Sequence, residues 1–121
     1  MAVTLTTAPT PYPQILCIDD GQSLRIVFSV VVSGTYTAGS SNGEDLATIL
    51  ADERVKSSKA KLGQNLAFYC QSQNGTNPNP MHGTTRFRFW TAAGTELAGG
   101  AYAAAYTGDV IRVELSTRKY V

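Results

Sequence analysis

The chain has 121 residues, of which 43% are hydrophobic and 16% are charged, and ten basic side chains stand against nine acidic ones. This length suits one domain with a single core, and the composition excludes a disordered, strongly charged chain. The net charge of +1 provides no overall field for nucleic acid or an anionic membrane, and no apolar run approaches the roughly 20 residues that span a bilayer. We therefore expect no nucleic-acid partner and no membrane partner.

Prolines mark the beginning of the chain. They occupy positions 9, 11 and 13, and proline is unfavourable inside a sheet because it has no backbone N–H. We predict an extended N-terminal arm over residues 1–12 and a single β domain over residues 13–121. The arm has neither the basic region nor the apolar stretch of a secretory signal, so we expect the protein to act where it is made or within an assembled particle.

The segment 23–33 has the pattern of a core strand. Its residues alternate, so that one face of the strand is apolar and is predicted to face the core. The opposite face mixes Arg25 and Ser29 with two valines, which indicates partial cover by a second sheet or a neighbouring subunit. The predicted core face consists of Leu24, Ile26, Phe28, Val30 and Val32.

A short helix is predicted over residues 43–54. Ser41 and Glu44 have the spacing of a capping box, a common start of a helix. Leu46, Ile49 and Leu50 repeat at the three- and four-residue spacing of one helix face, which is typical of an amphipathic helix. No other segment of the sequence has a helical pattern.

Strand patterns dominate the second half of the chain. Residues 66–71 are a mainly apolar run that leads into a loop rich in Asn and Pro over residues 73–80, both of them turn-forming residues. Phe87 and Phe89 alternate with Arg86 and Arg88, and the segment 110–121 alternates again. Five or six short strands with one short helix predict an all-β fold, a small jelly-roll-like β-sandwich or barrel.

Few residues have a pattern that supports catalysis or metal binding. Cys17 and Cys70 are too few for a zinc site, and each lies in an apolar stretch, which fits two buried thiols or one bridge between adjacent strands. The single histidine, His82, has no nucleophile or carboxylate near it in the sequence, and Asp19 and Asp20 fit a turn better than a catalytic pair. We expect a protein that is not an enzyme, with no catalytic residue, metal or cofactor.

Aromatic residues support an alternative function, the binding of glycans. Trp90, Tyr102 and Tyr106, together with Tyr36, are candidates for a sugar-binding surface, because aromatic side chains combine a large apolar face with a polar handle. The same residues also fit half-buried positions of a β domain or of a subunit interface. The sequence leaves both interpretations open.

Several short stretches resemble one group of proteins. They are Tyr-Pro-Gln-Ile-Leu at residues 12–16, Asp-Gly-Gln-Ser at 20–23, and the segments 95–102, 106–111 and 118–121. Together they resemble the short, β-rich virion proteins of tailed bacteriophages, in particular capsid decoration proteins, which are also called cement or head auxiliary proteins. The resemblance implies a β-sandwich or barrel that assembles as a homotrimer, or sometimes a dimer, on the capsid surface and braces neighbouring copies of the major capsid protein.

The resemblance also suggests contact residues at both ends of the chain. The weak contacts of such residues add up when an oligomer binds a symmetric lattice. A tail or fibre-tip component of the same particle is the alternative location. The candidates for contact with the capsid or another partner are Thr4, Leu5, Thr6 and Tyr12 in the arm, and Arg118, Lys119 and Tyr120 at the other end.

Overall fold

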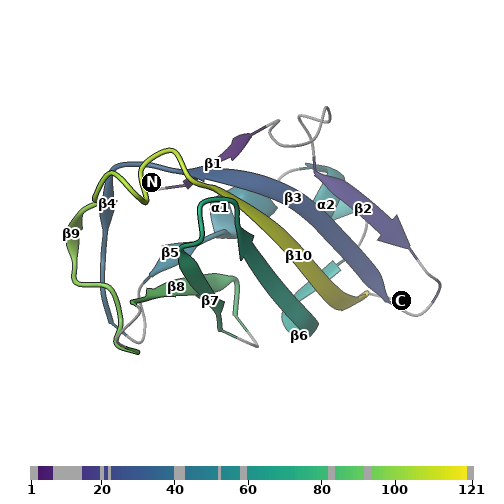
Figure 1. The fold of residues 1–121 in the computed structure, drawn as a ribbon. Coiled ribbons are helices and arrows are strands. Elements are labelled where there is room, and N and C mark those ends of the chain that lie inside the picture. Colours follow the sequence, from purple (N-terminus) through teal and green to yellow (C-terminus); the bar gives the residue numbers. More distant parts are fainter. Residues whose placement is uncertain are drawn as a thin grey trace.

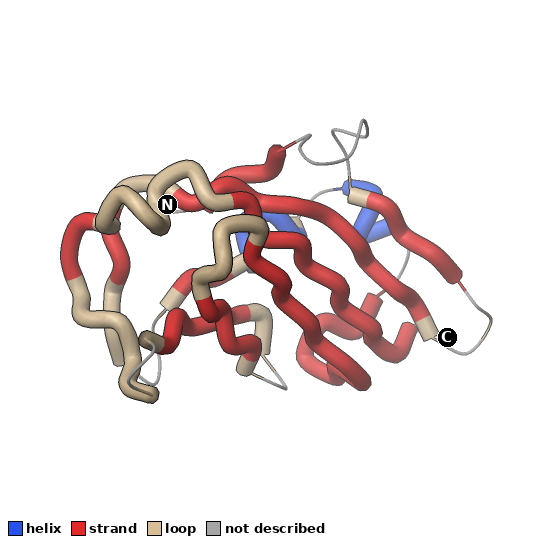
Figure 2. Tube along the Cα trace, in the orientation of Figure 1, coloured by secondary structure: helices blue, strands red, loops and turns tan. Residues whose placement is uncertain are grey.

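The computed structural model describes residues 3–6, 15–19, 21, 23–39, 43–51, 53–57, 60–81, 84–91 and 94–119. In these ranges the chain is mostly β-strand, arranged in three antiparallel sheets (Figures 1 and 2). The predicted all-β, sandwich-like fold is therefore confirmed. No helix in these ranges has the length and apolar character needed to cross a membrane.

A five-stranded sheet forms the first layer of the molecule. Its centre is the pair β3 (Leu24–Val32) and β10 (Val110–Lys119), which align antiparallel from Val110 opposite Val31 to Thr117 opposite Leu24. The other side of β10 pairs with β6 (Ala60–Ser72), the longest strand of the structure. The predicted strands around residues 66–71 and 110–121 are thus present, and they are neighbours.

Two short strands share the remaining edge of β3 (Figure 1). β1 (Val3–Thr6) pairs with Val32 to Ser29, and β2 (Leu16–Asp19) pairs with Val27 to Leu24. Residues 3–6 of the predicted arm are extended, as expected, but they belong to the sheet, and Val3 is fully buried in the core. The arm could not be recognised as a strand because its partner lies more than 20 residues away, and residues 7–12 lie outside the described ranges.

Shorter strands form the second layer. β5 (Glu44–Asp45), β8 (Arg86–Trp90) and β7 (Asn77–Pro80) make a three-stranded sheet, and β4 (Thr35–Tyr36) pairs with β9 (Gly100–Ala101) at one end of the molecule (Figure 1). Two short helices, α1 (Ala47–Leu50) and α2 (Glu53–Ser57), follow β5.

The core lies between the layers and confirms the predicted alternation. All five residues of the predicted core face of β3 are buried, and so are Phe87 and Phe89 of β8, whereas Arg86 and Arg88 are partly exposed. Alternation predicts these faces because successive strand residues point to opposite sides. The helices add Ile49, Leu50 and Val55 to the same core.

The predicted helix over residues 43–54 has different bounds. Glu44 is a strand residue that pairs with Phe87, and α1 begins only at Ala47. The N–H of Ala47 donates to Asp45 Oδ1 over 3.0 Å, so an aspartate side chain supports the helix start, in place of the predicted Ser41–Glu44 capping box. The capping-box pattern is local, whereas the pairing of β5 with β8 is a long-range contact that overrides it.

The two cysteines do not form a disulfide. Cys17 lies on β2 and Cys70 on β6, with β3 and β10 between them, and both are half-buried thiols. Three strand spacings of about 4.8 Å separate their backbones, about twice the distance that a disulfide spans. The interpretation as thiols is confirmed, and burial raises the pKa of the Cys70 thiol well above its ordinary range.

Candidate functional site

An aromatic cluster joins the second layer to the segment that follows β9. Phe89 is its centre: its ring centroid lies 5.9 Å from that of Tyr36, 5.8 Å from Tyr102 and 5.2 Å from Tyr106, with steeply inclined ring planes. Such edge-to-face contacts are favoured between aromatic rings. Three of the four predicted aromatic residues therefore meet, but Tyr36 and Tyr102 are buried in the hydrophobic core and Tyr106 is partly buried against it.

Tyr102 is unavailable for stacking on a sugar. Its side chain is buried, and its hydroxyl donates to Glu44 Oε1 over 2.7 Å. Burial raises the pKa of Glu44, and the hydrogen bond from Tyr102 offsets only part of that effect. Burial, followed by the hydrogen bond to Glu44, also raises the pKa of Tyr102 far above its ordinary value. The prediction that Tyr102 belongs to a glycan-binding surface is wrong. Tyr102 is a core residue whose hydroxyl donates a hydrogen bond to the buried Glu44.

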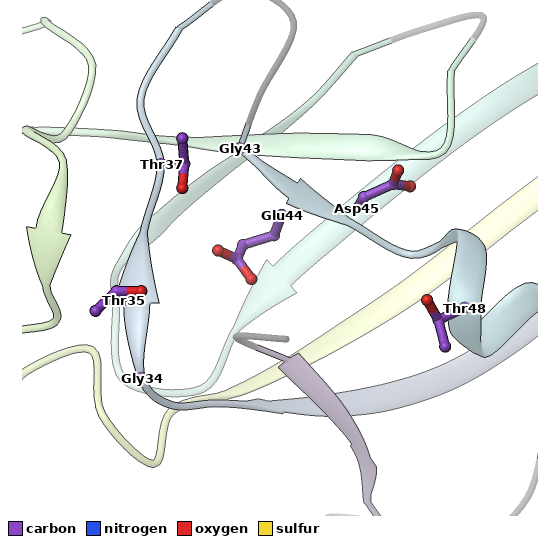
Figure 3. Close-up of a pocket in the computed structure, with 7 residues that line it drawn as sticks. All are labelled: Gly34, Thr35, Thr37, Gly43, Glu44, Asp45 and Thr48. Atoms are coloured by element: carbon purple, nitrogen blue, oxygen red, sulfur yellow. The ribbon is translucent and has the colours of Figure 1, made fainter.

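Glu44 also borders a polar hollow of about 440 Å³ between β4 and β5. Figure 3 shows its side chain extending toward the strand that carries Thr35 and Thr37, while Asp45 points the opposite way. Asp45 Oδ2 lies 3.5 Å from Arg86 Nε, so that acid has its own partner. The two carboxyl groups diverge and do not form a catalytic pair. The lining residues are Gly34, Thr35, Thr37, Gly43, Glu44, Asp45 and Thr48.

A second acid, Glu96, connects three segments at the same end of the molecule. It accepts a hydrogen bond of 2.6 Å from the Tyr36 hydroxyl and one of 3.1 Å from the N–H of Gly39, and Arg88 lies 3.6 Å away. Burial by itself raises the pKa of Glu96, but these hydrogen bonds and the Arg88 charge outweigh it and hold the pKa below its ordinary value. Glu96 is thus a charged structural link.

A hollow of about 290 Å³ brings together the other two predicted glycan residues, Trp90 and Tyr106. Trp90 ends β8 and pairs with Asn77, the first residue of β7. The guanidinium of Arg88 lies over the Trp90 ring, with its carbon 5.3 Å from the ring centroid, within the range of a cation–π contact. The hollow is lined by Asn74, Gly75, Thr76, Asn77, Trp90, Thr91, Ala105 and Tyr106, and we name it the Trp90 hollow.

Asp109 fixes the turn that forms one wall of the Trp90 hollow. Its side chain is fully buried and accepts hydrogen bonds of 2.5 Å from the Ser72 hydroxyl, 2.6 Å from the Thr76 hydroxyl and 3.0 Å from the N–H of Asn74. A buried carboxylate is stable only when its oxygens are satisfied in this way. The buried Asp109 carboxylate therefore fixes the turn between β6 and β7, whose residues also line the hollow. Sequence reasoning missed Asp109, because its partners lie more than 30 residues away.

A different kind of surface lies on the outer face of the five-stranded sheet. Leu16 is paired with Val27, Val27 with Glu114, and Glu114 with Tyr69, so these four residues form one row across the sheet. Leu16 is 53% exposed and Tyr69 is 65% exposed, and they are the exposed large hydrophobic residues of the described chain. A 3.3 Å ion pair between Arg25 and Glu114 lies beside them. We name this row the outer-face row.

The predicted capsid-contact residues lie at opposite ends of the same sheet. Thr4, Leu5 and Thr6 belong to β1, which pairs with the Val32 end of β3. Arg118 and Lys119 end β10 beyond the Leu24 end of β3, and Arg118 is exposed. Tyr12 and Tyr120, like His82 and Asp20, lie outside the described residues.

The described residues contain no group of three or more His, Cys, Asp or Glu side chains that is placed to hold a metal ion. In comparisons with known proteins, no family model, no curated protein and no solved structure matches this chain.

Proposed function

We propose that this protein is a structural component of a tailed-bacteriophage virion, a capsid decoration protein that binds the outer surface of the head as an oligomer and stabilises it. The short stretches that resemble decoration proteins support the family, and the outer-face row is the observation that carries the proposal. Its exposed apolar side chains lie on a five-stranded sheet, where they are available to a partner subunit or to the capsid.

The energetics of the outer-face row fit association. Transferring a large apolar side chain from water to a packed interface contributes about 1.5 to 3 kcal/mol, and Leu16 and Tyr69 are both more than half exposed. Val27 lies between them in the row and is partly buried. Glu114 lies within the row and is paired with Arg25, and this charged pair favours one orientation of a partner over others.

The ends of the sheet suit a bracing role. β3 has nine residues, so at about 3.4 Å per residue the two ends lie roughly 30 Å apart. β1 is at one end, and Arg118 is at the other. A protein bound through both ends spans two neighbouring capsid subunits, and an oligomer multiplies each weak contact.

The test combines light scattering with sedimentation. We expect the purified protein to be a trimer in solution and to pellet with phage heads that lack it, raising the temperature at which those heads rupture. Replacing Tyr69 by Ser is expected to weaken the oligomer or the binding to heads. Gln71→Ser is the matched control, because Gln71 is also exposed on β6, two residues away.

The proposal is overturned if the protein is a monomer in light scattering and does not pellet with phage heads. If the protein pellets with isolated tails and not with heads, it is a tail or fibre-tip component. If the oligomeric state and the binding to heads are the same for Tyr69→Ser, Gln71→Ser and the parent protein, the outer-face row is not part of the interface.

A further inference from the structure

From the geometry of the Trp90 hollow we infer that it binds one ring of a neutral pyranose sugar. This activity is separate from assembly, because the hollow lies at the junction of β7, β8 and the 103–107 turn, and none of its lining residues belongs to the outer-face row. It would let the particle hold weakly to glycans on a cell surface.

The first argument is the chemistry of the walls. Trp90, one face of which is covered by Arg88, and Tyr106 both line the hollow, and an aromatic ring suits the C–H groups on the apolar face of a pyranose ring. Asn74 and Asn77 supply amide groups, each of which both donates and accepts hydrogen bonds, as sugar hydroxyls require. A few polar groups beside an aromatic wall are the usual composition of a small-molecule site.

The second argument is that the amides are available. Asn74 and Asn77 are exposed, and their side chains make no hydrogen bond within the described ranges. Their backbones are nevertheless fixed, since the Asn74 N–H binds buried Asp109 and Asn77 pairs with Trp90. A site whose donors and acceptors are already placed loses little entropy when it binds a ligand.

The third argument concerns the class of sugar. None of the eight lining residues is charged, and the nearby Arg88 is already paired with Glu96. The hollow therefore favours a neutral sugar over a sialylated or sulfated one, whose charge would be left without a partner. The volume of about 290 Å³ lies just below the range of about 300 to 1,000 Å³ that is typical of small-molecule sites. It therefore suits one ring at a time.

Trp90 makes the test direct, because it is the single tryptophan of the chain. We would titrate the full-length protein with methyl glycosides of glucose, galactose and N-acetylglucosamine and follow the tryptophan fluorescence. At least one of them is expected to give a saturable change, with a dissociation constant of about 1 mM or somewhat lower, as is usual for so small a contact. Sialic acid is the charged comparison and is expected to give no saturable change.

Two variants of β7 test the location of the site. Asn77→Ala is expected to weaken binding by about fivefold to tenfold, the loss that one or two neutral hydrogen bonds predict. Asn79→Ala is the matched control: Asn79 is exposed on the same strand, two residues away, and does not line the hollow. Its affinity is expected to equal that of the parent protein.

Trp90→Phe tests the aromatic wall and keeps the fold. The buried indole Nε1 has no hydrogen-bond partner in the described part of the chain, so its loss leaves no other group unsatisfied. Saturation-transfer NMR, which needs no tryptophan, is expected to detect the sugar on this variant. Trp90→Ala is expected to lose about tenfold in affinity or more.

The inference is overturned if none of the three glycosides gives a saturable change with the parent protein. It is also overturned if Asn77→Ala and Asn79→Ala bind equally well, because the sugar would then occupy another surface. Both results are independent of the sedimentation with heads, so the two proposals fail separately.

Discussion

Asp109, which precedes β10, is expected to contribute more to stability than any polar residue of the β6–β7 turn that it holds. Its carboxylate accepts hydrogen bonds from the Ser72 hydroxyl, the Thr76 hydroxyl and the Asn74 N–H, and it is fully buried. Replacing Asp109 by Ala removes all of these acceptors and leaves three partly buried hydrogen bonds without an acceptor. A donor that loses a charged acceptor costs about 1.5 to 3 kcal/mol.

The total cost is smaller than the sum of three such losses. Ser72 Oγ lies 2.8 Å from Thr76 Oγ1, 3.0 Å from the Thr76 N–H and 3.2 Å from the Asn74 N–H, so it can take over part of the acceptor role. We therefore expect Asp109→Ala to lower the free energy of unfolding by about 3 to 4 kcal/mol. Asp109→Asn keeps one acceptor oxygen and the shape of the side chain, and it is expected to cost about 1 to 2 kcal/mol.

Urea unfolding followed by tryptophan fluorescence and circular dichroism measures both values. Amide hydrogen exchange adds a local readout, because the protection of the Asn74 and Thr76 amides should fall more than that of the β3 amides. Thr76→Val is a useful comparison, since it removes one donor without opening a cavity. If Asp109→Ala costs less than about 1 kcal/mol, the carboxylate does not hold the turn and the reasoning is refuted.

Three further predictions concern the core and its buried acid. Phe89→Ala is expected to cost about 3 to 5 kcal/mol in urea unfolding, because the Phe89 ring contacts four other rings; a cost below about 1 kcal/mol would contradict its central place. Gly43→Ala is expected to cost more than about 1 kcal/mol, because Gly43 has a φ of +90° and an added Cβ would lie 2.6 Å from the Phe87 carbonyl oxygen; a neutral result would mean that β5 moves freely. Burial raises the pKa of Glu44 above its ordinary 4.5, so the folded protein keeps this proton to a higher pH than the unfolded chain does. The stability that Glu44 contributes therefore falls as the pH rises through its raised pKa. Glu44→Gln does not titrate, so its free energy of unfolding relative to the parent should rise as the pH increases above the ordinary Glu value of 4.5; a constant difference would show that Glu44 has no such linkage.

Sequence reasoning predicted the elements whose signal is local. The alternation of Phe87 and Phe89 with arginines identified both β8 and its buried face, and the same pattern identified β3 and β10. These predictions succeed because a strand with one buried face must repeat its apolar residues with a period of two. The thiol state of the cysteines was one of two readings that the sequence left open.

The candidate sites could be predicted only in part. Trp90 and Tyr106 were recognised by residue type, and the structure brings them to one hollow, whereas Tyr102 lies in the core. No pattern in the sequence separates these three, because each is an aromatic residue near turns rich in glycine and alanine. Asn74 and Asn77 looked like turn residues, and their position beside Trp90 follows from the pairing of β7 with β8.

By itself the sequence determined the all-β class and the inward faces of the main strands, because both depend on the spacing of apolar residues along one segment. Only the tertiary structure decided that residues 3–6 extend the sheet, that Glu44 is a strand residue bonded to Tyr102, and that Asp109 supports the turn beside the Trp90 hollow. Each of these depends on partners that lie 23 to 58 residues apart in the chain. Such pairings are chosen by burial and by the need to satisfy buried polar groups, and neither quantity exists until the layers pack together.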